Sequence, residues 1–258
     1  MCGRFALYSD FPSLARSLKL PLAEAALMPR YNVAPGTWIS AVRPHDDSGQ
    51  LSLDALWWGY RPHWADDKAP QPINATVEKV ATSSYFRGAF ANHRCLVPAD
   101  GWYEWLAVDG RKQPHYLTRG DGEPLWFAGI WTERPDGKPG CAILTEPARG
   151  VAKAIHPRMP LILDQQSLEP WLDPELTDRE TIRHLVHHLP HDRLTHWPVS
   201  PRVNKPVEDD PALIEAWPVT NDWNGLSRRR GIRSLSMLGP RGLIGSYGEV
   251  FSGAAVEI

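Results

Sequence analysis

The stretch RCLVPADGWYEWLAV (residues 94–108) carries the pattern that decides the fold class, because its apolar and aromatic residues predict one or two β-strands. Three further short apolar segments follow it, each bounded by Gly, Pro or Asp: PHYLTR (114–119), LWFAGIW (125–131) and CAILTE (141–146). Short strands separated by turn residues are typical of a sheet-dominated protein.

Working outward, strands are also expected in four other segments: CGRFALY (2–8), ISAVRP (39–44), LDALWWGYRP (53–62) and PLILD (160–164). Helices are expected at 10–20, capped by Ser9 or Asp10, and at 77–93. Another should follow a capping box of Thr177 and Glu180, with an apolar stripe from Ile182 to Leu189. The prediction is a mixed α+β fold dominated by its sheet.

Composition sets limits on the function. The chain has 258 residues and 25 prolines, which argues against an all-helical bundle. Its net charge is −2, so any nucleic-acid surface has to be a local patch. Because no signal segment or membrane-length apolar run is visible, we expect no membrane partner and a cytoplasmic, reducing location. One domain is predicted over 1–220, with an extension of unknown role at 221–258.

Cys2 is the residue whose chemistry stands out. The initiator Met1 is normally removed when the next residue is small, which leaves an amine and a thiol on one residue. Their ordinary pKa values, about 8 and about 8.5, make both usable nucleophiles near neutral pH. Such a pair traps an aldehyde as a Schiff base and then closes a thiazolidine ring. By position, Cys2 is not expected to be buried, whereas Cys95 and Cys141 lie in apolar runs and are expected in the core.

Three other residues are candidates for proton transfer or positioning. If GWYEW is a strand, Glu104 and Trp102 share a face, and aromatic surroundings raise the pKa of a carboxylic acid. A solvated edge position for Glu104 is the alternative. His156 precedes a proline, which places it in a loop, and its ordinary pKa suits proton exchange. Asn74 is either a hydrogen-bonding amide or a turn residue.

Two clusters invite a functional interpretation that we do not favour. His184, His187, His188 and His191 fall on one side of the helix predicted after Thr177. Histidines one turn apart can bind zinc, but the glutamate of the metalloprotease motif is missing. Arg228, Arg229 and Arg230 are more simply a solvated tail than a nucleic-acid contact. No cofactor or metal is therefore expected.

Taken together, the motifs resemble the SRAP (SOS-response-associated peptidase) family of abasic-site processing or shielding proteins. The resemblance spans about residues 1–216, and its segments stand in the family's order: MCGRFA, RYNVAPGT, WWGYRPHW, INATVE, ADGWYEW, FAGIW, AILTEPA, IHPRMPLIL and HWPVSPRVN. It implies a compact α+β domain around a curved, barrel-like and mostly antiparallel sheet, with flanking helices and a basic cleft for single-stranded DNA.

The resemblance also implies roles for individual residues. The family's catalytic cysteine, asparagine, glutamate and histidine fall on Cys2, Asn74, Glu104 and His156. Its DNA contacts fall on six residues, namely Arg4, Asn32, Pro35, Trp64, Arg87 and Arg158. Two positions depart from the family: Thr76 stands where an Arg is frequent, and Ala65 where relatives have a second aromatic residue, so DNA contacts are expected to be fewer there.

The implied function is covalent capture of abasic sites in single-stranded DNA by a monomer, through a Cys2 thiazolidine, after the protein has removed its own Met1. Lyase-type reversal belongs to the same chemistry. Two alternatives stay open: a general thiol peptidase, and a non-covalent damaged-DNA-binding module. The sequence does not divide the proton-transfer roles between Glu104 and His156.

Overall fold

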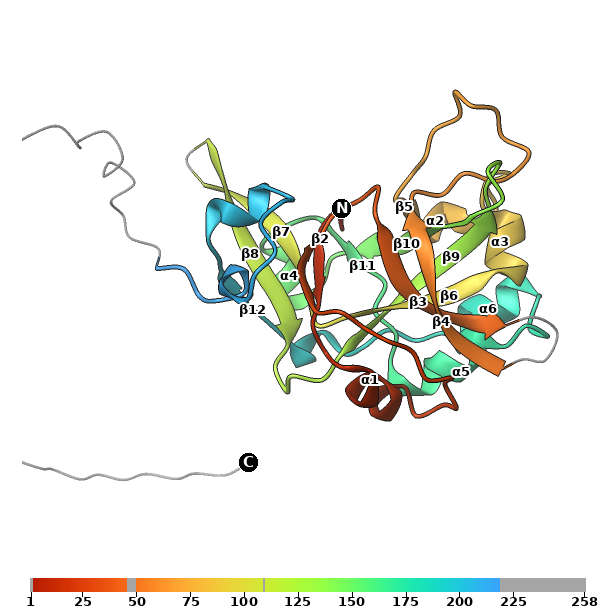
Figure 1. Cartoon of the computed structure of the whole chain (residues 1–258), viewed down its shortest axis with the longest axis horizontal. Coiled ribbons are helices and arrows are strands. Elements are labelled where there is room, and N and C mark those ends of the chain that lie inside the picture. The colour runs from red at the N-terminus through yellow and green to blue at the C-terminus, as the bar shows by residue number, and fades with distance from the viewer. Residues whose placement is uncertain (1, 46–49, 109, 219–258) are drawn as a thin grey trace, which may run out of the picture. The chain divides into compact units, whose positions relative to one another are not determined.

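The computed structural model describes residues 2–45, 50–108 and 110–218. Its strands form two sheets, one seen at the left of Figure 1 and the other at the right. The first sheet is antiparallel throughout and contains five strands, in the order β12 (Leu194–Pro198), β8 (Arg111–Arg119), β7 (Gly101–Val108), β1 (Phe5–Leu7) and β2 (Arg30–Val33).

The second sheet has seven strands and a ring-like course. Its main order is β11 (Arg158–Pro160), β10 (Pro139–Pro147), β4 (Gln50–Trp58), β3 (Trp38–His45), β6 (Arg94–Ala99) and β9 (Leu125–Glu133), and β5 (Asn74–Thr76) pairs with β10. Strand β10 also pairs with β9, which joins the last strand of this order to its second strand. The ring is not a closed barrel, since β3 and β6 share one residue pair, Val42 with Leu96. The mixed, mostly antiparallel α+β fold predicted from the sequence is confirmed.

Alternation along β7 separates two apolar clusters. Trp102 and its cross-strand partner Leu117 belong to the main core, which lies largely within the second sheet. Tyr103 and its partner Tyr116 belong to a smaller cluster on the opposite face. Glu104, two residues after Trp102, therefore points to the main-core side, as the sequence predicts.

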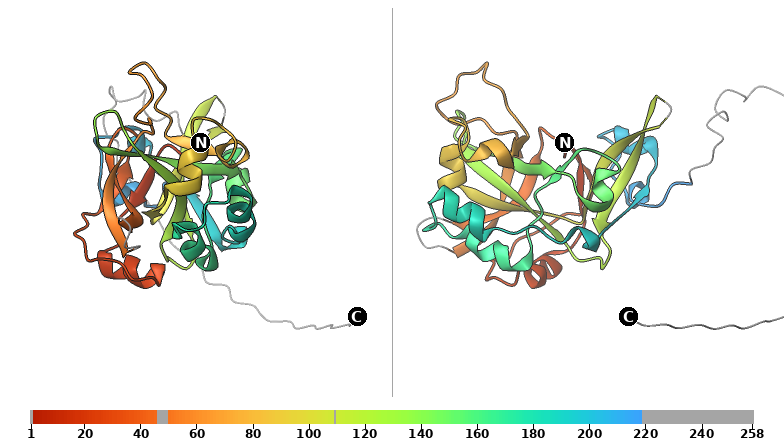
Figure 2. Two further views of the ribbon diagram at one scale, coloured as in Figure 1. Left: turned by 90° about the vertical axis from the view of Figure 1, so that its right-hand side faces the viewer. Right: turned by 180° about the vertical axis from the view of Figure 1, so that it is seen from behind.

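The helices are short and flank the sheets (Figure 2): α1 (Phe11–Leu18), α2 (Val77–Val80), α3 (Arg87–Asn92), α4 (Gly150–Lys153), α5 (Leu168–Leu172) and α6 (Arg179–Leu185). Four 3₁₀ turns complete the described elements: η2 (Gln165–Ser167), η3 (His191–Arg193), η4 (Pro201–Asn204) and η5 (Pro211–Leu213). Asp10 caps α1 through its side chain, and Cys95 and Cys141 are buried, as expected.

Several predicted boundaries are wrong. The helix expected at 77–93 is two helices, α2 and α3, separated by turns around Ser83. The cap of α6 is Asp178, which accepts from Thr181, so the capping box of Thr177 and Glu180 does not form. The strand expected at 160–164 is β11, which ends at Pro160 and is followed by isolated bridges. Local sequence patterns do not fix these ends, because tertiary contacts decide where pairing stops.

Arg94 illustrates how loops are tied to the second sheet. This residue is buried at the start of β6, and its guanidinium donates to five backbone carbonyls, those of Phe90, Ala91, Trp171, Asp173 and Leu176. The contacts join α3, α5 and the segment before α6. A planar group with five N–H donors is suited to this role, and an ammonium group is not.

We expect Arg94→Lys to lower the free energy of unfolding by about 2 kcal/mol, because several buried carbonyls lose their donors. Urea denaturation followed by circular dichroism measures the change. Arg183→Lys on α6, whose side chain is half exposed, is the matched control and should leave the midpoint unchanged. An unaltered midpoint for Arg94→Lys would show that these bonds contribute little.

Among the described residues, none of the helices has the length and apolar character that crossing a membrane requires. The proposed extension at 221–258 and the cluster Arg228–Arg230 lie outside the described residues.

Candidate active site at the N-terminus

Cys2 reaches the centre of the molecule through the pairing of β1 with β7. Phe5 lies opposite Trp102, and the Tyr103 N–H donates to the Arg4 carbonyl at 2.9 Å. In an antiparallel pair, the residues before Phe5 run towards the residues after Trp102. The start of the chain therefore lies alongside Glu104, between the two sheets (Figure 1).

Asn74 holds the backbone of Cys2 from the other sheet. It is the first residue of β5, where it pairs with Ile143 of β10. Its Nδ2 donates to the Cys2 carbonyl at 2.9 Å. The Oδ1 of the same amide is buried and accepts no hydrogen bond from the described residues. One side of the Asn74 amide thus fixes Cys2, and the other side has capacity for a further donor.

Glu104 is a buried acid at this point. Its side chain is on the main-core face of β7, and the residue is 4% exposed. Burial disfavours the carboxylate and raises the pKa of Glu104 to about 7. Near neutral pH both protonation states are therefore populated, which is the condition for a group that gives a proton in one step and takes it back in another.

His156 stands beside this acid. It lies in the loop between α4 and β11, as predicted, and its Nδ1 is 4.0 Å from Glu104 Oε2. The Arg158 N–H donates to the same Nδ1 at 3.0 Å, which orients the ring. Burial lowers the pKa of His156, so the neutral imidazole predominates at pH 7. The structure thus brings together all four residues that the sequence singled out: Cys2, Asn74, Glu104 and His156.

Two expectations about Cys2 are wrong. The residue is fully buried and belongs to the main apolar core, because the adjoining β1 is held between β7 and β2 and directs Phe5 into the same core. Its thiol is also a poorer acid than the sequence suggests: burial raises the pKa of the Cys2 thiol far above its usual range, and the nearby Glu104 charge adds to the effect. At pH 7 the sulfur is protonated, so it needs a base at the moment of reaction.

A cavity of about 550 Å³ opens onto this pair. Glu104 and His156 line it together with three residues that sequence reasoning missed, Trp105, Lys112 and Asn204. The indole Nε1 of Trp105 donates to Asn204 Oδ1 at 2.7 Å, which joins β7 to η4. Trp105 lies in the GWYEW motif, but strand alternation placed it on the other face. Asn204 ends the HWPVSPRVN segment, which gave no role for this residue, and Lys112 carries no signal in the sequence.

Arg4 and Asn32, two predicted DNA contacts, are linked to each other. Arg4 donates to Asn32 Oδ1 at 2.7 Å and to the Val203 carbonyl at 2.8 Å. Asn32 is almost completely buried, and its Nδ2 donates to the carbonyls of Lys205 and Glu208. Asn32 therefore anchors the segment around 203–208 and does not present its amide to the surface. We assign it a positioning role in place of the direct contact expected from the sequence.

Arg158 and Arg87 differ in how their charges are balanced. The Arg158 guanidinium forms a two-pronged ion pair with Glu78, with N–O distances of 2.6 and 3.1 Å. It also donates to the Thr145 carbonyl. Arg87, at the start of α3, is exposed, and no described carboxylate pairs with it. A DNA phosphate would compete with Glu78 for Arg158, whereas Arg87 is available directly.

Trp64 and Pro35 lie on loops at the surface. Trp64 is 59% exposed, and its ring meets the Tyr85 ring edge-on at 5.6 Å. Ala65, which follows it, is buried and adds no aromatic surface. Pro35 is half-buried in the loop between β2 and β3. Both positions are compatible with the expected contacts to DNA bases.

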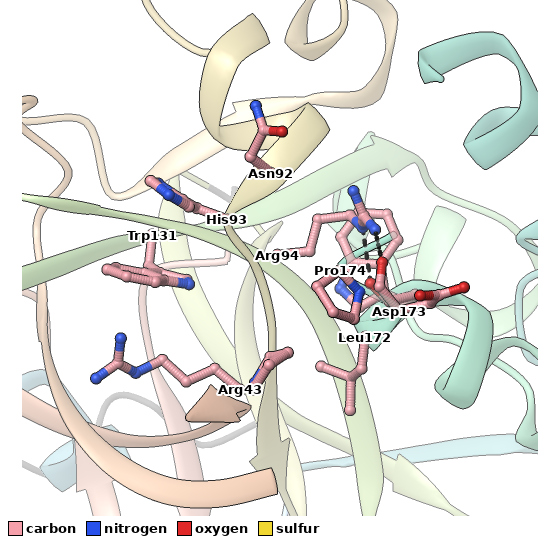
Figure 3. A pocket seen from close by; sticks show the side chains of 10 residues that line it. Arg43, Asn92, His93, Arg94, Trp131, Leu172, Asp173 and Pro174 are labelled. Atoms are coloured by element: carbon pink, nitrogen blue, oxygen red, sulfur yellow. Dashed lines mark hydrogen bonds between the residues drawn. The ribbon is translucent and has the colours of Figure 1, made fainter. Parts of the chain in front are cut away.

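A second cavity, of about 370 Å³, lies between β3, β6, β9 and α5 (Figure 3). Trp131 stands between Arg43 and His93, at 4.3 Å from the guanidinium and 4.6 Å from the imidazole ring. Arg43 is paired with Asp54 at 2.6 Å, and Arg94 is occupied by the carbonyls described above. Because these groups already have partners, we assign no binding site to this cavity.

The histidine stripe does not form. Helix α6 ends at Leu185, so His184 lies on it, while His187, His188 and His191 follow in an extended segment and a turn. No group of three or more potential metal ligands was found within residues 2–45, 50–108 and 110–218.

Comparison with known proteins now places the chain. The family model described as SOS response associated peptidase (SRAP) matches residues 1–206. This chain belongs to the SRAP family. Among its relatives, the abasic site processing protein YoqW of Bacillus subtilis (strain 168) is 33% identical over 225 residues, covering 84% of this chain and all of YoqW. The abasic site processing protein YedK of Escherichia coli (strain K12) is 37% identical over 188 residues, covering 70% of this chain and 83% of YedK.

Solved structures with a similar fold are also found. A phage-related protein from Bordetella bronchiseptica has a TM-score of 0.64 and 33% identity, over 77% of this chain and 94% of its own. A protein from Bacteroides thetaiotaomicron has a TM-score of 0.72 and 20% identity, over 84% of this chain and all of its own. The second likeness concerns the fold alone.

Proposed function

We propose that this SRAP protein cross-links itself to abasic sites in single-stranded DNA through a thiazolidine at Cys2, and so protects the lesion during the response to DNA damage. The observation that carries the proposal is the meeting of Cys2, Asn74, Glu104 and His156 in one cluster, of which Glu104 and His156 line the cavity. The names of YoqW and YedK, both abasic site processing proteins, support the substrate class. The protein would act as a cytoplasmic monomer and without a cofactor.

The first step forms an imine. Once Met1 is removed, the Cys2 amine adds to the aldehyde of the ring-opened sugar and gives a carbinolamine. The free Oδ1 of Asn74 is suited to accept a hydrogen bond from that amine, because its Nδ2 already holds the Cys2 carbonyl. Protonated Glu104 then gives its proton to the departing hydroxyl, which leaves as water. The products are an iminium ion and a Glu104 carboxylate.

The second step closes the ring. The Glu104 carboxylate takes the proton of the Cys2 thiol, and the sulfur adds to the iminium carbon. The product is a neutral thiazolidine, and Glu104 returns to its acid form, so the proton balance closes with one water lost. The Cys2 thiol can therefore react although burial raises its pKa. The base that removes its proton is the Glu104 carboxylate, which forms when Glu104 gives its own proton to the departing hydroxyl.

DNA affinity would come from a local surface. Arg87 and Lys112 are exposed, and Lys112 lines the cavity beside Glu104 and His156. Phosphates that approach Arg158 have to share it with Glu78. Because the overall charge is −2, we expect a small number of phosphate contacts and a moderate dependence of affinity on salt. Trp64 would lie against a base next to the lesion.

Mass spectrometry tests the proposal directly. The protein is incubated with a single-stranded oligonucleotide that carries one abasic site, and the intact mass is measured. The expected product is the chain without Met1, plus the oligonucleotide, minus one water, with the adduct on the Cys2 peptide. An adduct on a chain that retains Met1, or on a lysine, would rule out the thiazolidine.

His156 offers a narrower test. We expect His156→Ala to slow cross-linking or its reversal about 100-fold, the scale of a lost proton-transfer group, while DNA binding is retained. Gel-based time courses measure the forward rate, and transfer of the adduct to excess competitor DNA measures reversal. His184→Ala, an exposed histidine on α6, is the control. Unchanged rates in both directions would remove His156 from the mechanism.

The alternatives make different predictions. A general thiol peptidase would turn over peptides when Met1 is already absent, but a peptidase thiol normally has a lowered pKa, and burial raises that of Cys2. Removal of the protein's own Met1 is compatible with the same residues. A non-covalent binding module would retain DNA without any adduct that survives heating.

A further inference from the structure

Two tryptophans form a platform at one end of the second sheet, in which Trp38 is exposed and Trp57 is half-buried. Trp38 begins β3 and Trp57 lies next to the end of β4, and they are directly opposite each other in the antiparallel pair. Their ring centres are 5.6 Å apart, in an edge-to-face arrangement. Trp38 is 41% exposed, whereas Trp58 and Trp126, which also lie in strands of this sheet, are buried. A tryptophan left at the surface of a sheet offers an apolar face to a partner.

Basic side chains surround this Trp38–Trp57 platform. The Arg134 guanidinium is 5.7 Å from the Trp57 ring, and the Lys138 ammonium is 5.9 Å from the Trp38 ring. Arg134 is fixed in place, since it donates to the Gly59 carbonyl at 2.9 Å. Asp136 lies 3.5 Å from Arg134 and partly balances its charge. Lys138 is exposed, so its charge is accessible next to the Trp38 ring.

The platform adjoins the loop that carries Pro35, one of the DNA contacts expected from the sequence. The loop between β2 and β3 carries Pro35 and then Gly36, whose φ of +70° suits glycine. The Cα of Gly36 faces Trp57, such that a Cβ there would be 3.9 Å from the indole Cζ2. Figure 1 shows this loop leading from the strand beside the N-terminal segment into β3. A DNA strand in contact with Pro35 would be close to Trp57, which lies against Gly36, and to its partner Trp38.

We propose that the Trp38–Trp57 platform holds the unpaired DNA strand just beyond the abasic nucleotide, with a base against Trp38 and a phosphate near Lys138. Surfaces that bind single strands combine stacking aromatic rings with cations, and both are present here. The occupant is the continuation of the same strand, because the platform adjoins the Pro35 loop, where a DNA contact is expected. The inference rests on the proposed function and adds a second contact region to it.

Trp38→Ala tests the inference, with Trp217→Ala as the matched control, because Trp217 is 43% exposed. Binding is measured by fluorescence anisotropy with undamaged single strands, so that no adduct contributes. With strands of about 20 nucleotides, we expect Trp38→Ala to bind about tenfold more weakly than the wild type. The ratio of the two dissociation constants should approach one as the strand is shortened to about 3 nucleotides. Trp217→Ala should match the wild type at both lengths.

Two further variants separate stacking from charge. Trp38→Phe retains an aromatic ring and should restore most of the affinity. Lys138→Gln should reduce the slope of log affinity against log salt by about 1, as expected for one lost phosphate contact. Melting temperatures of all variants check that they fold. Equal affinity of Trp38→Ala and wild type for the long strand would overturn the inference.

The outcomes also distinguish this inference from the proposed function. If the wild type forms no adduct but Trp38→Ala still weakens binding to the long strand, the inference about the platform is supported and the covalent mechanism is wrong. If adducts form normally and Trp38→Ala binds the long strand as tightly as the wild type, the covalent mechanism is supported and the inference about the platform is wrong. If the wild type does not bind single strands at all, both are wrong.

Discussion

Cys2→Ala is expected to abolish the DNA adduct that survives heating, while the protein stays folded and still retains single-stranded DNA. Alanine keeps the α-amine after Met1 is removed but lacks the sulfur that closes the ring. The imine alone is reversible and hydrolyses under denaturing conditions. Denaturing gels of the protein with an abasic-site oligonucleotide measure the loss, and native gels measure the DNA binding that remains.

A second cysteine provides the control for this loss. Cys95→Ala removes another buried, unpaired thiol, from β6, and should cross-link as the wild type does. Borohydride reduction should restore a stable adduct for Cys2→Ala, because it traps the imine formed by the amine. If Cys2→Ala gave a full yield of adduct without a reductant, the sulfur would have no part in the reaction, and the thiazolidine would be excluded.

Glu104→Gln is expected to stabilise the fold at alkaline pH while it slows cross-linking. The pKa of Glu104 is about 7 in the folded protein, against an ordinary value of 4.5. As pH rises from 4.5 to 7, the unfolded chain releases the proton and the native state keeps it, so native stability falls. Above pH 7 the free energy of unfolding of the wild type has fallen by roughly 3 kcal/mol. The variant does not lose this stability, because glutamine does not ionise.

The measurement is the melting temperature of wild type and variant at pH 4 and at pH 8. The melting temperature of Glu104→Gln minus that of the wild type should be about 6–10 °C larger at pH 8 than at pH 4. Glu133→Gln, which changes an exposed carboxylate at the end of β9, is the control and should show no such pH dependence. An equal difference at both pH values would mean that Glu104 is not a raised-pKa acid.

The same substitution should reduce the rate of cross-linking about 100-fold or more, because an amide neither gives a proton to the departing water nor takes one from the thiol. In the wild type, the rate should fall at acid pH as the Cys2 amine becomes protonated, and at alkaline pH as Glu104 ionises. Loss of the alkaline limb in Glu104→Gln would assign that limb to this residue. A wild-type rate in the variant would contradict the role given to Glu104.

The sequence by itself determined the residues that carry the chemistry and the local pattern that presents them. Alternation in GWYEW placed Glu104 with Trp102 on one face of a strand, and the proline after His156 placed that histidine in a loop; both are seen in the structure. These features are local, because a side chain's face follows from the two-residue period and a proline restricts the residue before it.

Tertiary structure alone decided how those residues act. The pairing of β1 with β7 buries Cys2 and raises its thiol pKa, and the pairing of β5 with β10 brings Asn74 to the Cys2 carbonyl. The tertiary structure also pairs Arg158 with Glu78 and leaves Trp38 exposed beside Trp57. Strand partners that are 69 and 97 residues apart leave no periodic trace in the sequence, and the burial that shifts a pKa exists only once those strands have met.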